Sequence, residues 1–336
     1  MQTAIKTKVI LAVGVAAAAL LVVSGSALGQ VATFTPTPTP TGTGTPAAAT
    51  ATATPTTTPA ATVTGTVTPA ATLTVTPTPV PGAPAVPHDA RYFAQTGYRI
   101  DNDTIWDYFN RRGSVPTFGY PVSRTFLFRG VQVQFFQRRI VEIGSNGQAR
   151  QANLLDPELM PYTRINGATF PAPDPAVQSA APSPTDASAT LAFVQRTAPN
   201  QFNSRPVNFH MTFSNTVTLQ VAFPNGGDPA LLPGINLEMW GVPISNPAAD
   251  PNNANFIYQR WQRGIMHYRV ECNCTEAILL ADYLKAILTG QNLPADLDQQ
   301  AQGSRFYKQY DSTKPGWVRD PALLPSTDMT HAFTMG

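Results

Sequence analysis

Two short motifs occur twice along the chain in the same order, and this repeat constrains the fold more than any other feature. Residues 118–123 read FGYPVS and residues 240–245 read WGVPIS; we call these the turn motifs. Each is followed by a hairpin motif, VQVQFFQRRI at 131–140 and FIYQRWQRGI at 256–265. Such ordered matches indicate an internal duplication, so the fold should contain the same local unit twice. The matched pairs are Phe118 and Trp240, Pro121 and Pro243, Ser123 and Ser245, Gln134 and Gln259, Phe136 and Trp261, Arg138 and Arg263, and Ile140 and Ile265.

The residue types of these motifs predict a tight turn followed by a β-hairpin. Glycine beside an aromatic residue permits a sharp turn or a close approach to the ring, and proline holds the residue before it in an extended conformation. Alternation in VQVQF is typical of a strand, and residues 256–261 take the same place in the second copy. Residues 262–264 are predicted to form the hairpin turn, with Gly264 at positive φ. Because Arg139 stands in place of Gly264 in the first copy, that turn is expected to be strained or differently shaped.

The chain as a whole is predicted to be α+β, with two small modules built from β-hairpins and short helices. Capping residues and helical spacing of apolar side chains mark the helices, and runs of β-branched and aromatic residues mark further strands. The expected elements are a helix at 104–112 capped by Asp103, strands at 207–213 and 216–223, a helix at 276–289 capped by Thr275, and a helix from Pro294 toward Tyr310.

Composition divides the chain into regions. No charged residue lies between Lys8 and Asp89. A basic start, an apolar run and small residues predict a signal peptide at 1–29, with an uncleaved membrane anchor as the alternative. Thr, Pro and Ala dominate the following segment, which has too few large apolar side chains to fold and suits O-glycosylation. The expected regions after the signal peptide are a disordered Thr/Pro stalk at 30–87, a first module at 88–169, a Pro/Ala/Ser linker at 170–190, and a second module with C-terminal helices at 191–336.

Charge and cysteine content narrow the possible partners. The net charge of +2 and the absence of a basic stripe argue against nucleic acid as a partner. Cys272 and Cys274, separated by one residue, are candidates for a disulfide in an exported chain. Intermolecular pairing and half of a metal site are the alternatives. No second pair of Cys or His has ligand spacing, so we expect neither a metal nor a cofactor.

The two copies resemble the LGFP repeat, a short module of secreted bacterial cell-envelope proteins. In the second copy, the matching residues are Trp240-Gly241-Val242-Pro243-Ile244-Ser245 and Tyr258-Gln259-Arg260-Trp261-Gln262-Arg263-Gly264-Ile265. An aromatic residue replaces the leading Leu of that family, and the two copies are not in tandem. The resemblance covers only the motif regions. It implies association with the bacterial cell wall.

The hairpin motifs contain residue types that hold sugars. An aromatic ring covers the apolar face of a pyranose, while amide and guanidinium groups bond its hydroxyls. We expect Trp261 and Ile265 in the core, and Arg260, Arg263 and His267 at the surface. The prediction is an exported, non-catalytic cell-surface protein that binds cell-wall or extracellular polysaccharide and contacts a membrane only if its N-terminal segment stays uncleaved. The candidate ligand-binding residues are Tyr258, Gln259, Arg260, Gln262, Arg263, His267, Tyr268, Gln134 and Arg138.

Two other functional classes stay open. The protein could be a surface-layer or adhesin subunit that assembles with copies of itself. It could also be a cell-wall hydrolase, although the sequence has no nucleophile elbow, zinc-protease motif, phosphate-binding loop or dinucleotide fingerprint. Cys274 with His331 is the remaining nucleophile–base pairing, and no pair of carboxylates is marked for glycoside hydrolysis. An enzyme is therefore the weaker hypothesis.

Overall fold

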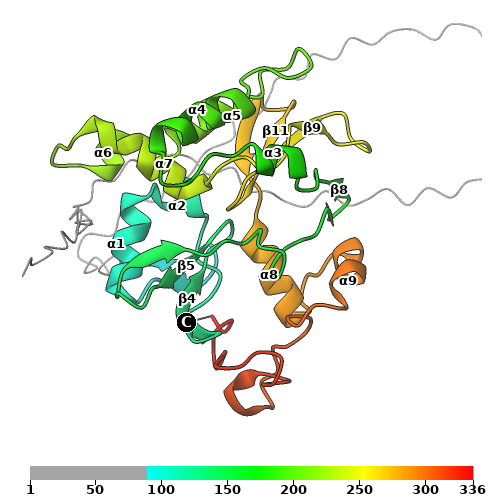
Figure 1. Ribbon diagram of the computed structural model, residues 1–336. Coiled ribbons are helices and arrows are strands. Elements are labelled where there is room, and N and C mark those ends of the chain that lie inside the picture. The colour runs from blue at the N-terminus through cyan, green and yellow to red at the C-terminus, as the bar shows by residue number, and fades with distance from the viewer. Residues whose placement is uncertain (1–88, 336) are drawn as a thin grey trace, which may run out of the picture. The chain divides into compact units, whose positions relative to one another are not determined.

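The computed structural model describes residues 89–335, so the predicted signal peptide and stalk lie outside the described residues. The described chain is α+β, as predicted, with short helices and small antiparallel sheets (Figure 1). None of the helices within 89–335 combines the length and the apolar character needed to cross a membrane. The helices are α1 (Asp103–Arg111), α2 (Ser114–Phe118), α3 (Pro175–Ser179), α4 (Ala187–Thr197), α5 (Phe209–Asn215), α6 (Leu219–Ala222), α7 (Leu232–Trp240), α8 (Leu280–Thr289) and α9 (Ala295–Ala301), with 3-10 turns η1 (Pro229–Leu231) and η2 (Pro315–Trp317).

Two four-stranded antiparallel sheets form the centre of the fold, and they have the same topology. Their strand orders are β3-β4-β5-β6 and β9-β10-β11-β12. The hairpin motif of each copy contains the first of the two middle strands, the turn and the first residue of the second middle strand. The strands are β3 (Phe126–Phe128), β4 (Val131–Phe135), β5 (Ile140–Ile143), β6 (Ala149–Gln151), β9 (Ala248–Ala249), β10 (Phe256–Arg260), β11 (Ile265–Arg269) and β12 (Cys274–Ala277), with two-residue pairs β1 (Tyr92–Phe93) with β2 (Tyr98–Arg99) and β7 (Arg164–Ile165) with β8 (Ala168–Thr169).

The turn motif of each copy is bonded to the hairpin motif in the same way. Ser123 Oγ accepts from the Phe135 amide at 2.8 Å, and Ser245 Oγ accepts from the Arg260 amide at 2.9 Å. The amide group of Gln134 donates to the Ser123 carbonyl. Its counterpart in the second copy makes the equivalent bond to the Ser245 carbonyl. Because the same side chains satisfy the same backbone groups in both places, the predicted duplication extends to the hydrogen-bond network.

A cluster of three aromatic rings is also duplicated. Phe109 of α1 stacks on Phe136 with ring centroids 5.2 Å apart, and Phe118 packs against both. In the second copy the rings are Phe213 of α5, Trp261 and Trp240; Phe213 stacks on Trp261 at 5.5 Å, and Trp240 is tilted against Trp261. Each copy therefore packs a preceding helix onto its hairpin through the matched aromatic positions.

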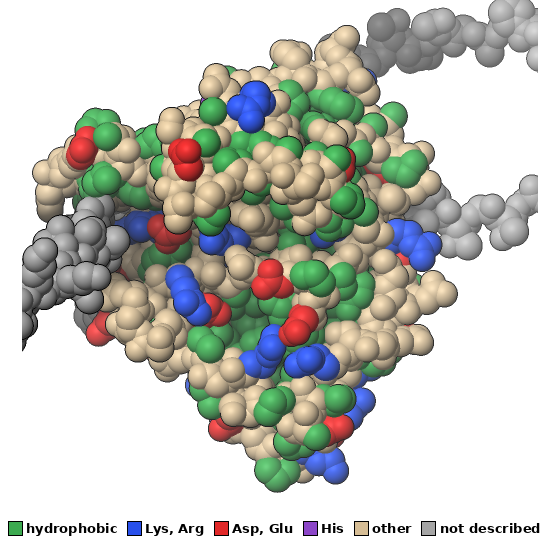
Figure 2. Space-filling view, viewed as in Figure 1, with side chains coloured by type: hydrophobic (Ala, Val, Ile, Leu, Met, Phe, Trp, Pro, Cys, Tyr) green, Lys and Arg blue, Asp and Glu red, His purple; other side chains and the backbone are tan. Residues whose placement is uncertain are grey.

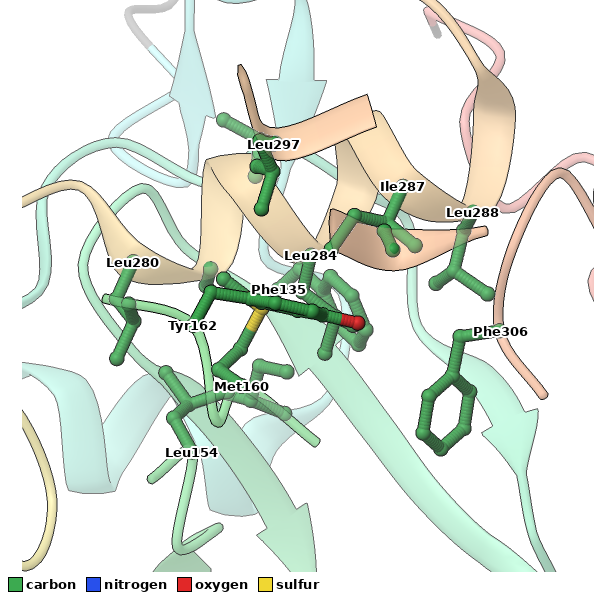
Figure 3. Packing of buried hydrophobic residues seen from close by; sticks show 14 of the residues in the cluster. Phe135, Leu154, Met160, Tyr162, Leu280, Leu284, Ile287, Leu288, Leu297 and Phe306 are labelled. Carbon is green, nitrogen blue, oxygen red and sulfur yellow. The ribbon is translucent and has the colours of Figure 1, made fainter. Parts of the chain in front are cut away.

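The two copies share their hydrophobic cores. Residues 89–335 belong to one compact unit. One core contains Phe135 of the first hairpin together with Tyr258 and Ile265 of the second, and α8 packs against this core (Figure 3). The other contains Phe136 of the first hairpin and Trp261 of the second. Because both sheets contribute to both cores, the two copies do not have separate cores.

Two segments predicted to be strands are helices instead. Residues 207–213 and 216–223 contain most of α5 and all of α6. In α5, the spacing of four residues between Phe209 and Phe213 places both rings in the core, with exposed fractions of 0% and 2%. The Thr218 hydroxyl caps α6 by accepting from the Val221 amide. The aromatic and β-branched composition favoured strands, but the buried face has helical periodicity.

Helix boundaries and the predicted linker also differ from expectation. Asn102, not Asp103, accepts at the N-cap of α1. Thr275, the predicted cap, and residues 276–277, predicted to be helical, lie in strand β12, which pairs with β11, so α8 begins at Leu280. The last predicted helix is only α9, because the chain turns to bury Phe306 in the core. The expected linker at 170–190 contains α3 and the start of α4.

The turns of the two hairpins have the same shape, contrary to prediction. The Phe136 amide donates to the Arg139 carbonyl, and the Trp261 amide donates to the Gly264 carbonyl, each at 2.9 Å. Neither Arg139 nor Gly264 has a positive φ. The left-handed conformation belongs to the glycines of the turn motifs, Gly119 at +75° and its second-copy counterpart at +69°. Glycine is therefore required where the chain leaves α2 and α7, not in the hairpin turn.

Candidate functional site

Most of the predicted ligand-binding residues lie in the interior. Tyr258, Gln259, Arg260, Tyr268 and Gln134 are between 0% and 3% exposed. The side chains of these residues alternate between the two faces of the hairpins. Each face is covered by a different hydrophobic core, so neither face is open to a ligand. The prediction that these side chains form a surface site is wrong. The expected burial of Trp261 and Ile265, each 0% exposed, is confirmed.

Arg260 was expected at the surface and is instead a buried structural residue. Its Nε donates to the Pro171 carbonyl and its Nη2 to the Tyr162 carbonyl, each at 2.8 Å. Phe135 occupies the same strand position in the first copy. Burial lowers the pKa of Arg260 to about 10. The guanidinium therefore ties the chain before α3 to the second sheet rather than facing solvent.

His267 and Arg138 are also placed by packing. The His267 ring lies against Phe256 and Tyr258. Burial lowers the His267 pKa to about 3, with smaller contributions from the charges of Arg269 and Arg138, so the imidazole is neutral at ordinary pH. Arg138 Nε donates to the Ala277 carbonyl, and burial lowers its pKa. Neither side chain stands free at the surface as the prediction required.

Gln262 and Arg263, at the turn of the second hairpin, are the two predicted residues that border an open pocket. The pocket has a volume of about 370 Å³. It lies between the end of α7, the second turn motif and the segment before α4. Its lining combines polar groups with small and aliphatic side chains: Ala181, Pro182, Pro184, Thr190, Gly234, Leu237, Glu238, Gly241, Val242, Gln262 and Arg263.

The two polar side chains from the hairpin turn are fixed by the fold. Gln262 Oε1 accepts from the Val242 amide at 3.0 Å, which leaves the NH₂ group of this exposed side chain for another partner. Arg263 Nε donates to Asn153 Oδ1 at 3.0 Å, and its Nη1 donates to the Glu238 carbonyl at 2.7 Å. Nη2 of Arg263 makes no hydrogen bond with the described residues. The pocket thus has two oriented groups of N–H donors at one side.

Glu238 supplies the carboxylate of the pocket. Its Oε1 accepts from the Tyr108 hydroxyl at 2.6 Å, and its Oε2 accepts from Arg112 Nε and Nη2 at 3.1 and 2.9 Å. Burial, and next the charge of Glu238, raise the pKa of Tyr108. In all of these bonds Glu238 is the acceptor, and its carboxyl group is held in place by Tyr108 and Arg112.

The far wall of the pocket comes from the segment that the sequence suggested was a linker. This wall is formed by Ala181, Pro182 and Pro184. Thr190 of α4 also lines it, and its hydroxyl donates to the Asp186 carbonyl at 2.7 Å. No sequence signal pointed to these residues, because proline and alanine in a low-complexity stretch are typical of a spacer. Gly234 in α7 also lines the pocket, and a Cβ placed there would meet no atom within 4 Å.

The first copy presents a different surface at the equivalent place. Tyr120 stands where Val242 stands in the second copy, and its ring packs against Phe93. Gln137 makes the same bond as Gln262, with its Oε1 accepting from the Tyr120 amide at 3.0 Å. The duplicated network is thus conserved in geometry, while the side chains around it differ. The described residues that line the pocket all lie between Ala181 and Arg263, outside the first copy.

Ionisable groups at the seam between the copies lie apart from the pocket lining. The Asp282 amide donates to the Gln137 carbonyl at 3.1 Å, where α8 meets the first hairpin turn. Burial raises the Asp282 pKa to about 6, against the opposing charges of Lys285 and Arg138. Acidic and basic side chains are interspersed across the face shown in Figure 2, without a large patch of one sign. At this seam, Arg138 of the first hairpin turn forms an ion pair with Glu276 of β12.

The remaining sequence candidates also have definite places. Cys272 and Cys274 form a disulfide, as the sequence suggested, so Cys274 is not a free nucleophile. The His331 ring packs against Trp317 at 4.6 Å. Among residues 89–335, no three or more His, Cys, Asp or Glu side chains are grouped so that they could hold a metal ion.

Comparisons with known proteins give no further assignment. The chain matches no protein-family model, no curated protein and no solved structure. The resemblance of the motifs to the LGFP repeat therefore stays a prediction.

Proposed function

We propose that this is an exported, non-catalytic cell-surface protein that binds a cell-wall or extracellular polysaccharide in the pocket beside the second turn motif. The observation that carries the proposal is the placement of Gln262 and Arg263 at the rim of a pocket of about 370 Å³. Small-molecule pockets usually measure about 300–1,000 Å³. A volume at the lower end of that range suits one or two sugar units of a longer chain.

The chemistry of the lining supports a sugar. The Gln262 NH₂ group and Arg263 Nη2 are donors, and the Glu238 carboxylate is an acceptor. A sugar hydroxyl therefore finds a partner whether it donates or accepts a hydrogen bond. Leu237, Val242 and the prolines offer aliphatic surface to the C–H face of a ring. The pocket has no aromatic lining residue, so recognition would rest on hydrogen bonds and aliphatic contact rather than on stacking.

The same lining supports binding without hydrolysis. Glycoside hydrolysis generally requires two carboxyl groups across the scissile bond, one of them protonated. Among the described residues that line the pocket, Glu238 is the only acid, and both of its oxygens already accept hydrogen bonds from Tyr108 or Arg112. Asp282, whose pKa is raised, is not among the lining residues.

Gly234 provides the test of this proposal. Gly234→Leu should extend a side chain into the pocket from a helical position where a Cβ meets open space. Gly303→Leu is the matched control, because a Cβ at Gly303 also meets nothing within 4 Å and Gly303 does not line the pocket. Retention of the purified protein on isolated peptidoglycan and wall polysaccharide is measured at low salt, with soluble fragments as competitors.

We expect the wild type and Gly303→Leu to be retained equally, and Gly234→Leu to bind at least tenfold more weakly. Absence of retention for the wild type, or equal binding by Gly234→Leu, contradicts the proposal. Release of soluble sugars during the assay contradicts its non-catalytic part. Sedimentation of the wild type without polysaccharide identifies the alternative, a subunit that assembles with copies of itself.

A further inference from the structure

The disulfide Cys272–Cys274 links the loop after β11 to the first residue of β12, and these are the only cysteines of the chain. Cys272 is exposed and Cys274 is half-buried. A bridge between residues two positions apart encloses a single residue, Asn273. Its sulfur atoms therefore stand at the outer end of a hairpin, where a second molecule has access to Cys272.

The hairpin loop is held by hydrogen bonds that do not depend on the disulfide. The Asn273 amide donates to the Val270 carbonyl, and the Val270 amide donates to the Asn255 carbonyl. The Tyr268 hydroxyl donates to Asn273 Oδ1 at 2.8 Å. Beyond the loop, β11 and β12 pair in register from Arg269 with Cys274 onward. The loop therefore has bonds enough to keep its shape when the two sulfur atoms are separated.

The short separation also limits what the bridge adds to folding. In the chain-entropy account, a disulfide stabilises the native state by restricting the unfolded chain, and the effect grows with the size of the enclosed loop. A loop closed around one residue restricts the unfolded chain very little. By thermodynamic linkage, a disulfide that adds little to the free energy of folding is in turn protected little by folding against reduction. The pair should then resemble a free Cys-x-Cys segment, which small thiols reduce, rather than a structural bridge.

We infer that Cys272–Cys274 is a thiol–disulfide exchange site whose substrates are exposed dithiols, such as paired cysteines of an extracellular protein. A substrate thiolate attacks Cys272 Sγ, the Cys272–Cys274 bond breaks, and Cys274 leaves as a thiolate that takes up a proton. The second substrate thiolate then attacks the substrate sulfur that is bonded to Cys272, a disulfide forms within the substrate, and Cys272 leaves as a thiolate that takes up a proton. The substrate dithiol loses two electrons to become a disulfide, and the protein pair gains them.

Exposure favours attack at Cys272, because Cys272 is exposed and Cys274 is half-buried. Cys274 Sγ lies 3.8 Å from Glu276 Oε1 on β12, so the inner sulfur is flanked by a carboxylate and by the strand. Cys272 Sγ lies 3.9 Å from the Arg269 carbonyl oxygen. The inference rests on this hairpin and does not depend on the sugar pocket.

Alkylation and mass spectrometry test whether small thiols reduce the Cys272–Cys274 disulfide while the protein stays folded. The native protein is equilibrated with graded ratios of reduced to oxidised glutathione or dithiothreitol, free thiols are trapped, and folding is followed by circular dichroism. We expect both thiols to appear while the spectrum stays native, and Cys272→Ser/Cys274→Ser to melt within a few degrees of the wild type. A pair that resists excess dithiothreitol in the native protein, or a double variant that has lost most of its stability, overturns the inference.

The exchange part is tested with a reduced peptide that contains two cysteines. The wild type should oxidise one peptide per disulfide, and the double variant none. Supplied with the oxidised peptide, Cys274→Ser should accumulate a mixed disulfide on the exposed Cys272, and Cys272→Ser should accumulate it more slowly. Failure of the wild type to oxidise the peptide, or faster trapping by Cys272→Ser, contradicts the assigned roles.

Discussion

Replacing Gly241 with Ala tests the interpretation that the turn motif holds the hairpin through its glycine. Gly241 has a φ of +69°, and a Cβ added there would overlap Gln262 Oε1 and lie 2.7 Å from Gln262 Cβ. The bond from the Val242 amide to Gln262 Oε1 would be displaced by the same methyl group. One substitution therefore perturbs the backbone and the contact between the two motifs together.

The expected cost follows from these terms. A non-glycine residue that combines a positive φ with a ψ near −150° costs about 1–3 kcal/mol, and a lost hydrogen bond costs about 1 kcal/mol more. Moving Gln262 away from the new methyl group costs further free energy. Gly241→Ala should therefore lower the free energy of unfolding by about 2–4 kcal/mol. Gly264→Ala is the matched control in the hairpin turn, where a Cβ would lie 3.2 Å from Trp240 Cζ3 without a positive φ. Because Arg139 carries a Cβ at the same place in the first copy, we expect a cost below about 1 kcal/mol.

Urea unfolding followed by tryptophan fluorescence measures both variants, and the free energies are compared through the midpoint at constant m-value. Gly119→Ala repeats the test in the first copy, where φ is +75° and a Cβ would lie 2.6 Å from Gln137 Cβ. If Gly264→Ala destabilises the protein as much as Gly241→Ala, the hairpin turn holds the required glycine and the reasoning is refuted.

Three further predictions concern Gly234 of helix α7, Asp282 of helix α8 and His267 of strand β11. Gly234→Ala should stabilise the protein by about 0.5–1 kcal/mol in urea unfolding, because glycine inside a helix is unfavourable and the new methyl group meets no atom; a destabilised variant contradicts this. Burial raises the Asp282 pKa from 3.8 to about 6, so ionisation costs stability as pH rises through this interval. Asp282→Asn should therefore be more stable than the wild type at pH 7, by at most about 3 kcal/mol, with the advantage vanishing near pH 4. Burial lowers the His267 pKa from 6.5 to about 3, so the unfolded chain takes up the proton first and stability is lost as pH falls across this interval. Thermal melts between pH 7 and 3 should show a smaller acid loss for His267→Gln, and parallel curves would contradict the assigned burial.

The motifs allowed the repeated unit to be predicted, but not the role of its side chains. Matched Gly, Pro, Ser and Gln residues make the same local bonds in both copies, because each bond joins groups close together in the sequence. The prediction failed for Arg260, whose carbonyl partners are Tyr162 and Pro171. Those partners lie far from it along the chain. An arginine in an alternating strand has the composition of a surface residue, and nothing local shows that a second core covers it.

The pocket could not be predicted for the same reason. Gln262 and Arg263 were recognised from their place in the hairpin motif, but the opposite wall at Pro182 and Pro184 comes from a stretch whose composition is that of a spacer. Gly234 gave no local signal of a ligand site either. A pocket is formed by surfaces that meet in space, and the periodicity of each segment reports only which of its own faces is apolar.

By itself, the sequence determined the α+β class, the duplication and the positions of the two hairpins, because each depends on spacing within a short stretch of chain. It marked Cys272 and Cys274 as disulfide candidates, and the structure decided that they pair with each other. Tertiary structure alone decided that the hairpins are covered on both faces, that residues 207–223 are mostly helical, and that the open polar groups are those at the second hairpin turn. These features depend on which distant segments fill the space around a hairpin, and burial of apolar surface from the whole chain settles that choice.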